Sequence, residues 1–146
     1  MATVFRVLIV DDFEPWRRVV RWMLHYFAEW QIVGEASDGV EGVRKTEELQ
    51  PDIILLDIGL PKLNGIDAAE PILNVAPHSK IVFLSVELCP ELVQGALRTG
   101  AHGYVVKSDA ASDLLIAMST VMNGQRFVGP RFANYDFILA DDLHRA

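Results

Sequence analysis

Short apolar segments alternate with longer amphipathic segments along most of the 146-residue chain. An apolar run of about four to eight residues, bounded by turn residues, is typical of a strand buried on both faces of a parallel sheet. The intervening segments carry apolar residues at the 3.6-residue spacing of packed helices. Five such units in succession predict a doubly wound α/β fold, with a five-stranded parallel sheet and helices on both faces. The expected strands span residues 5–10, 31–36, 52–57, 80–85 and 103–107.

Residues that begin, end or interrupt helices lie between the expected strands. Asp38 and Glu41 have the spacing of a capping box, which predicts a second helix that Pro51 ends. Pro71 lies inside the expected third helix and would kink or divide it. The other helices are expected to begin near Pro15, Ile66, Pro90 and Asp109 or Ser112, and the last to end at Gly124.

The composition is typical of a single globular domain. Apolar residues make up 51% of the chain, and no apolar run approaches the roughly 18–20 residues that span a bilayer. The net charge of −7 argues against a general nucleic-acid-binding surface. Cys89 is the only cysteine, and the N-terminal residues contain no basic leader. We therefore expect a cytoplasmic protein without membrane contact or direct nucleic-acid binding.

Polar side chains stand at the carboxyl ends of four of the five expected strands. Asp11 and Asp12 follow the first strand, Asp57 ends the third, Ser85 ends the fourth and Lys107 ends the fifth. Ligands of doubly wound sheets bind outside the carboxyl ends of the strands. The five side chains are therefore expected to form one site.

The chemistry of this set favours phosphoryl transfer. Three carboxylates at one edge of a sheet repel one another unless a cation binds, and Mg²⁺ prefers such oxygen ligands. Asp57 is the candidate nucleophile, because a carboxylate can accept a phosphoryl group as an acyl phosphate. Lys107 and Ser85 would contact the phosphoryl oxygens. Asp12 alone would be interpreted as a capping residue and Ser85 alone as a turn hydroxyl, so the functional interpretation depends on their joint placement.

The motifs that carry these residues resemble the receiver domain of bacterial two-component response regulators. They are LIVDD at 8–12, DIILLDIGLPKLNG at 52–65, FLS at 83–85 and GAHGYVVKS at 100–108. The resemblance extends from about Val4 to Gly124 and implies the sheet order 2-1-3-4-5. The segments GEASDG, GAHGYVVK and NGQRFVGP look most like the LuxR/NarL-like subfamily, whose receivers usually precede a helix-turn-helix DNA-binding domain.

The resemblance also implies a cofactor and a phosphodonor. Asp57 would accept a phosphoryl group from a sensor histidine kinase, a phosphotransfer protein or a small phosphodonor, with Mg²⁺ bound. By match of position, the side chains of Asp12 and Asp57 and the carbonyl of Gly59 would bind the ion. Asp11 would bind it directly or through water.

Ser85 and Tyr104 match the switch pair of the family. In related receivers the hydroxyl moves toward the phosphoryl group and the aromatic ring turns inward. The resemblance thus implies a signalling switch and not an enzyme, with only limited self-phosphorylation and self-dephosphorylation chemistry. The chain would be a single-domain regulator or the isolated receiver of a transcriptional regulator.

Three other functions fit the sequence less well. A phosphatase with an aspartate nucleophile would resemble a D-x-D arrangement, but Gly59 stands where the second aspartate, the acid, would be. Flavin or nucleotide binding would call for a glycine-rich phosphate loop or a G-K-[ST] motif, and neither is present. A degenerate receiver that works without phosphate is disfavoured because every reactive position is filled.

The expected receiver domain spans residues 1–124. The part of the chain that follows it is too short for a helix-turn-helix domain. Only 22 residues follow, with three arginines and three aspartates, whereas that domain needs roughly three helices. We interpret residues 125–146 as a C-terminal tail or residual linker. Alternatively, this segment packs against a neighbouring molecule, which could be a second copy in a homodimer. Four of its residues could share one face of a short helix, namely Phe132, Tyr135, Leu139 and Leu143.

The first helix carries a concentration of cationic and aromatic side chains that is unusual in an acidic protein. Arg18 and Trp22 lie one helical turn apart, outside the stripe expected to face the sheet. Exposed tryptophan and arginine are common binding anchors. The first helix of related receivers contacts the kinase or phosphotransfer helices. Arg18 and Trp22 are therefore expected to belong to the docking surface for the phosphodonor protein.

Overall fold

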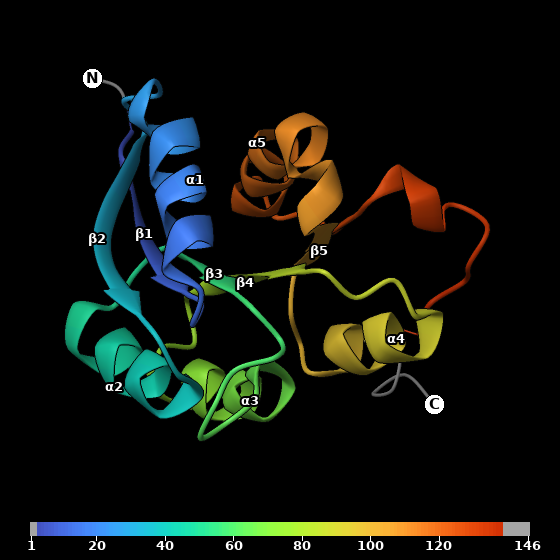
Figure 1. Cartoon of the computed structure of the whole chain (residues 1–146), viewed down its shortest axis with the longest axis horizontal. Helices are drawn as coiled ribbons and strands as arrows, with labels where there is room; N and C mark the ends of the chain where they lie inside the picture. Colours follow the sequence, from blue (N-terminus) through green and yellow to red (C-terminus); the bar gives the residue numbers. More distant parts are fainter. Residues whose placement is uncertain (1–2, 139–146) are drawn as a thin grey trace.

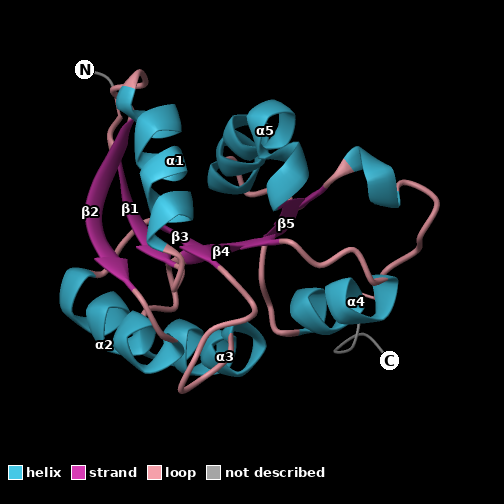
Figure 2. Cartoon of the chain, viewed as in Figure 1, coloured by secondary structure: helices cyan, strands magenta, loops and turns pink. Residues whose placement is uncertain are grey.

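The sheet of the computed structural model, which describes residues 3–138, contains six parallel strands in the order β2-β1-β3-β4-β5-β6 (Figure 2). This confirms the doubly wound fold and the order expected for the first five strands. The strands are β1 (Phe5–Val10), β2 (Trp30–Ala36), β3 (Ile53–Leu56), β4 (Lys80–Ser85), β5 (Gly103–Val106) and β6 (Phe127–Val128).

The sixth strand was not predicted. It pairs Phe127 with Gly103 and Val128 with Tyr104, and thereby extends the sheet beyond β5. Two residues are too few to produce a hydrophobic period, so a strand of this length leaves no pattern in the sequence. The division at residue 124 stays a prediction, and part of the segment that follows contributes to the sheet.

The helices begin and end close to the expected residues. The side chain of Asp38 accepts a hydrogen bond from the amide of Glu41 at 2.7 Å, which confirms the predicted N-cap. The third helix is not divided, because it continues through Pro71. The helices are α1 (Glu14–His25), α2 (Gly39–Leu49), α3 (Gly65–Val75), α4 (Pro90–Arg98) and α5 (Ala110–Met122), with 3₁₀ turns at Lys107–Asp109 and Pro130–Phe132.

Two helical layers enclose the sheet. Helices α1 and α5 cover one face, and α2, α3 and α4 cover the other (Figure 1). Each layer has its own apolar core: Val20 and Leu114 belong to the cluster on the first face, and Ile72 and Phe83 to the cluster on the second. The strands between them, buried on both faces, explain why their apolar runs are continuous. None of the described helices is long and apolar enough to cross a membrane.

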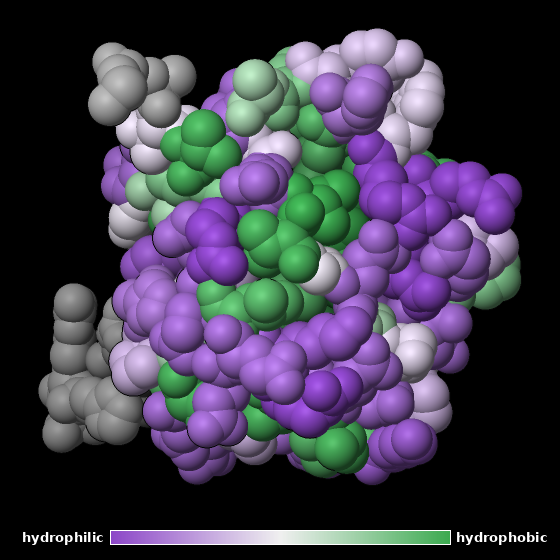
Figure 3. Space-filling model, turned by 90° about the vertical axis from the view of Figure 1, so that its left-hand side faces the viewer, coloured by the Kyte–Doolittle hydropathy of each residue, from purple (hydrophilic) through white to green (hydrophobic). Residues whose placement is uncertain are grey.

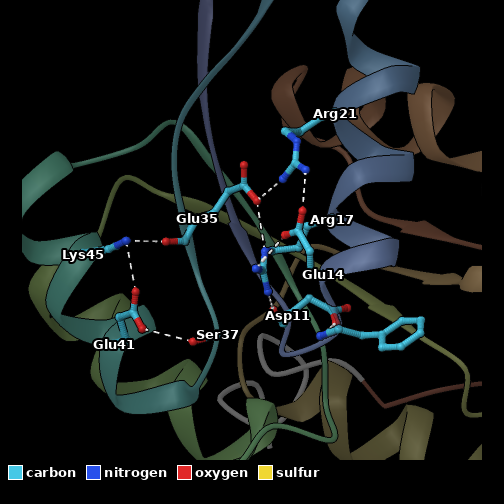
Figure 4. A network of polar contacts seen from close by, with 9 residues as sticks. Asp11, Glu14, Arg17, Arg21, Glu35, Ser37, Glu41 and Lys45 are labelled. Atoms are coloured by element: carbon cyan, nitrogen blue, oxygen red, sulfur yellow. Dashed lines mark hydrogen bonds and ion pairs between the residues drawn. The ribbon is translucent and has the colours of Figure 1, made fainter.

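Charged side chains tie α1 to the edge strand β2. The guanidinium groups of Arg17 and Arg21 both reach the carboxylate of Glu35, at 3.0 and 2.5 Å, and both also contact Glu14 at 2.7 Å (Figure 4). Arg17 additionally donates to the backbone carbonyl of Asp11. This network fixes the start of α1 beside the carboxyl end of β1.

The face of the molecule that carries β2 is mostly hydrophilic, with apolar side chains gathered near its middle (Figure 3).

The short helix considered as an alternative for the C-terminal segment does not form within the described residues. Phe132 lies in a 3₁₀ turn and Tyr135 lies after it, without helical structure. Leu139 and Leu143 lie outside the described residues.

Gly65 allows α3 to begin against the loop that follows β3. A Cβ atom at this position would lie 2.0 Å from the carbonyl oxygen of Asp57. That neighbour is backbone and cannot rotate away, so a side chain here would displace the chain at Asp57. In contrast, a Cβ at Gly95 in α4 would meet only Ile66, at 3.9 Å.

We predict that Gly65→Ala lowers the free energy of unfolding by roughly 1–3 kcal/mol, the usual cost of overpacking. Gly95→Ala is the matched control and should raise it by about 0.5–1 kcal/mol, because alanine favours the helix. Urea unfolding of the two variants measures both changes. Equal stability of Gly65→Ala and the parent protein would contradict the close approach.

Candidate functional site

Three aspartates lie together at the carboxyl ends of β1 and β3. One carboxylate oxygen from each of Asp11, Asp12 and Asp57 falls within 4.8 Å of the other two. Asp11 is 2% exposed and Asp57 8% exposed, whereas Asp12 is open to solvent. The amide of Asp57 donates to the carbonyl of Val10 at 3.0 Å, so the pairing of β1 with β3 brings the carboxylates together.

Lys107 provides a positive charge beside the carboxylates of Asp11 and Asp57. Its ammonium nitrogen lies 2.7 Å from Asp11 Oδ2 and 3.7 Å from Asp57 Oδ2. On another side the same nitrogen lies 5.3 Å from the ring centroid of Trp16, a favourable cation–π distance. The expected convergence of the acidic residues and the lysine is therefore present in the structure.

The ionised form of Asp57 is disfavoured at its position in the site. The pKa of Asp57 is raised from 3.8 to about 6, chiefly by burial and also by the neighbouring carboxylate of Asp11, while Lys107 acts in the opposite direction. The uncompensated negative charge at this position favours the binding of a cation. Carboxylate oxygens are the ligands that Mg²⁺ prefers, and those of Asp12 are open to solvent, so the three aspartates fit a magnesium ion. Gly59, two residues after Asp57, is exposed and has open space where a side chain would be.

Ser85 ends β4 and Tyr104 lies in the adjacent strand β5, and both contact the backbone of Glu87. Ser85 is 1% exposed, and its hydroxyl accepts a hydrogen bond from the amide of Glu87 at 3.2 Å. The Tyr104 hydroxyl donates to the carbonyl of Glu87 at 3.0 Å. Burial raises the pKa of Tyr104 to about 12, although a hydrogen bond with Ser85 partly opposes this shift. The structure thus connects the two residues that sequence reasoning paired by resemblance.

The α1 surface is less cationic than its sequence indicates. Arg17 and Arg21 are neutralised by Glu14 and Glu35, and this network could not be read from α1 alone. Arg18, by contrast, is exposed and forms no hydrogen bond or ion pair with the part of the chain that the structure describes. Trp22 is 64% exposed.

An apolar groove of about 550 Å³ runs between α1 and α5. Trp22 lines it from α1, Tyr26 from directly after that helix and Leu115 from α5, and Trp16 and Lys107 lie at the end that adjoins the acidic group. Trp16 belongs to the apolar stripe of α1 that the sequence assigns to the core, so this stripe also contributes to an open groove. The Trp16–Lys107 contact was missed because the two residues are far apart in sequence.

A comparison with known protein families agrees with this geometry. The model of the response regulator receiver domain matches residues 7–119. The chain belongs to this family.

Several relatives of this receiver are full-length regulators. It is 32% identical over 126 residues to the transcriptional regulatory protein DegU of Brevibacillus brevis, covering 86% of this chain and 53% of DegU. It is 34% identical over 132 residues to the response regulator GacA of Pseudomonas viridiflava, covering 89% of this chain and 61% of GacA. The chain thus spans a little more than half the length of these relatives.

Other similar proteins are the size of a receiver alone. The chain is 37% identical over 116 residues to the chemotaxis protein CheY of Thermotoga maritima, covering 80% of this chain and 96% of CheY. A LuxR-family response regulator from an Aurantimonas species superposes with a TM-score of 0.85 at 26% identity, covering 99% of this chain and all of that one. These similarities agree with the expected LuxR/NarL-like type of receiver in a two-component system.

The raised pKa of Asp57 predicts a pH-dependent stability. In the metal-free protein the ionised carboxylate opposes folding above about pH 6, and protonation removes this cost as the pH falls toward 4. Asp57→Asn should therefore raise the free energy of unfolding at pH 7 by up to about 3 kcal/mol, from a shift of about two pKa units. The gain should fall to less than about 1 kcal/mol near pH 4 and disappear only below the ordinary pKa of 3.8, where the aspartate is protonated in both states.

Urea unfolding in the presence of a chelator at pH 7, 5.5 and 4 measures this dependence. Asp109→Asn is the control of opposite sign, because its contact with Arg131 lowers the pKa of Asp109. That variant should lose stability at neutral pH. A gain for Asp57→Asn that stayed constant over the three pH values would contradict the assignment.

Proposed function

We propose that this receiver is a phosphoacceptor switch of a two-component phosphorelay, in which Asp57 accepts a phosphoryl group from a histidine kinase or phosphotransfer protein. The observation that supports this most strongly is the position of Lys107, 3.7 Å from Asp57 and 2.7 Å from Asp11. A lysine held there can contact a phosphoryl group on Asp57 without a rearrangement of the backbone.

Each side chain has a defined part in the proposed transfer. A carboxylate oxygen of Asp57 forms the bond to phosphorus while the bond between phosphorus and the donor breaks. The Lys107 ammonium and the Ser85 hydroxyl contact the phosphoryl oxygens, whose charge must be offset. Mg²⁺ would be held by Asp11, Asp12, Asp57 and the Gly59 carbonyl, and when bound it supplies further positive charge.

The proposed switch begins at Ser85. A phosphoryl group on Asp57 attracts the Ser85 hydroxyl, and the Tyr104 ring follows because its own hydroxyl lies beside that of Ser85. The chemistry at the site is limited to self-phosphorylation from small donors and to self-dephosphorylation. The protein would act as a single-domain regulator or as the receiver of a transcriptional regulator, in the cytoplasm.

We predict that acetyl phosphate with Mg²⁺ adds one acid-labile phosphoryl group, detected by intact-protein mass spectrometry as a single mass increment. Omission of Mg²⁺ or addition of a chelator should suppress it. Asp57→Asn should abolish it, because the amide cannot form the acyl phosphate, whereas Asp67→Asn, at an exposed aspartate of α3 outside the acidic group, should leave it unchanged. Equal labelling of Asp57→Asn would refute the assignment of the acceptor.

We also propose that Arg18 and Trp22 belong to the surface that docks the phosphodonor protein. Both side chains are exposed on α1, and Trp22 lines the groove whose far end contains Lys107. A helix seated in this groove would therefore lie next to the acceptor site. The apolar wall and the exposed guanidinium suit an amphipathic helix with an acidic residue.

The double variant Arg18→Ala/Trp22→Ala should slow transfer from the cognate kinase at least tenfold, the loss expected from one binding anchor. Labelling by acetyl phosphate should stay unchanged, because a small donor needs only the site around Asp57. Val40→Ala/Arg44→Ala is the matched control, since these residues are also exposed, one apolar and one cationic, and one turn apart on α2. Equal rates for the two double variants with the kinase would place docking elsewhere.

A further inference from the structure

The segment from Phe127 to Ile138, here called the strap, runs along the edge of the molecule from β5 to α4 (Figure 1). It begins as β6, which pairs with β5, and passes through the 3₁₀ turn at Pro130–Phe132. The proposed phosphorylation chemistry requires no part of it. The strap is nevertheless fastened to the receiver at several points along its length.

Two polar contacts fasten the strap at separate places. The guanidinium of Arg131 pairs with both carboxylate oxygens of Asp109, at 2.6 and 2.8 Å. Further on, the amide of Ile138 donates to the side-chain oxygen of Gln94 in α4 at 2.7 Å, and the Gln94 side chain donates back to the Ile138 carbonyl. Asp109 lies two residues after Lys107, so the first contact also connects the strap to the loop that carries the lysine.

Phe132 provides the apolar contact between these two. It is 4% exposed, although the strap residues on either side of it are exposed. Its ring meets the ring of Tyr104 edge-on, with the centroids 6.0 Å apart. Phe83 lies near Tyr104 as well, at a centroid distance of 6.4 Å. Tyr104 is completely buried in this arrangement.

The contact at Tyr104 continues to the proposed acceptor site through hydrogen bonds. The Tyr104 hydroxyl donates to the carbonyl of Glu87, and the amide of Glu87 donates to the hydroxyl of Ser85. A shift of the Tyr104 ring therefore displaces Glu87, whose amide holds the Ser85 hydroxyl. Phe132 lies at the other end of this connected set.

We infer that Phe132 is a positioning residue of the switch, which acts through Tyr104 and holds its ring in the inward conformation. This inference rests on the proposed function, since it assigns the strap to the Ser85–Tyr104 pair of that site. Coupling between two sites is reciprocal. A strap that stabilises the inward ring favours occupation of the acceptor site, and occupation of the site in turn tightens the strap. Whatever follows Ile138 in the chain is thereby linked to the state of Asp57.

The test measures the affinity of the full chain for beryllofluoride, a phosphoryl mimic, with Mg²⁺ present. Phe132→Ala should weaken binding about fivefold or more, the lower end of typical coupling between sites. Phe132→Leu, which keeps most of the apolar volume, should restore most of the affinity. Tyr135→Ala is the matched control, because its ring contacts Phe132 and Phe137 but not Tyr104, and it should change the affinity less than twofold.

A double-mutant cycle separates positioning from a general loss of stability. In a Tyr104→Ala background, Phe132→Ala should produce no further loss of beryllofluoride affinity, because its effect passes through the missing ring. An undiminished loss in that background would overturn the inference. So would full beryllofluoride affinity in folded Phe132→Ala, which would leave the proposed function intact.

Amide hydrogen exchange supplies a measurement that does not depend on the phosphoryl mimic. In the ligand-free protein, Phe132→Ala should speed exchange at the Glu87 amide, and Tyr135→Ala should not. If the parent protein did not bind beryllofluoride, the proposed function would fail, and unchanged exchange at Glu87 would then overturn the inference separately. If Phe132→Ala did not fold, Arg131→Gln, which loosens the strap at the surface, would replace it in both measurements.

Discussion

The ion pairs of Lys107 with Asp11 and Asp57 are the interaction on which the site depends. Two buried carboxylates beside an apolar core repel each other and lose their hydration, and among the described residues the Lys107 ammonium is the one cation that pairs with both. This arrangement requires β1, β3 and β5 to end at one level, which the parallel pairing of the strands provides. Asp57 remains partly uncompensated, as its raised pKa indicates. Because this negative charge is uncompensated, binding of a cation stabilises the site. The metal-free protein is correspondingly less stable, which is the usual cost of a functional site.

The sequence predicted the features that arise from a repeating pattern or from a fixed position relative to a strand. The strands, the helix cap at Asp38 and the grouping of Asp11, Asp57 and Lys107 belong to this class. Each follows from local periodicity together with one topological rule, that the carboxyl ends of parallel strands share an edge. A family resemblance added the pairing of Ser85 with Tyr104.

The features that were missed depend on contacts between segments that are far apart in the chain. β6 has only two residues and pairs because Tyr104 and its neighbours are already in place. The neutralisation of Arg17 and Arg21 on α1 requires Glu35, which lies on β2. Phe132 looked like a residue of an amphipathic tail, yet its burial depends on the rings of the core beneath it. Local pattern cannot anticipate which side chain fills a space that several elements create together.

The charge network on α1 has a consequence for the kinetics of association. Glu14 and Glu35 offset Arg17 and Arg21, so the exposed part of α1 presents little net charge beyond Arg18. Long-range attraction of a partner by this face should therefore be weak, with association nearer the roughly 10⁵–10⁶ M⁻¹s⁻¹ of neutral surfaces and little dependence on ionic strength. Discrimination between partners would then reside in how long each stays bound, which is decided by the fit of its side chains to the aromatic groove.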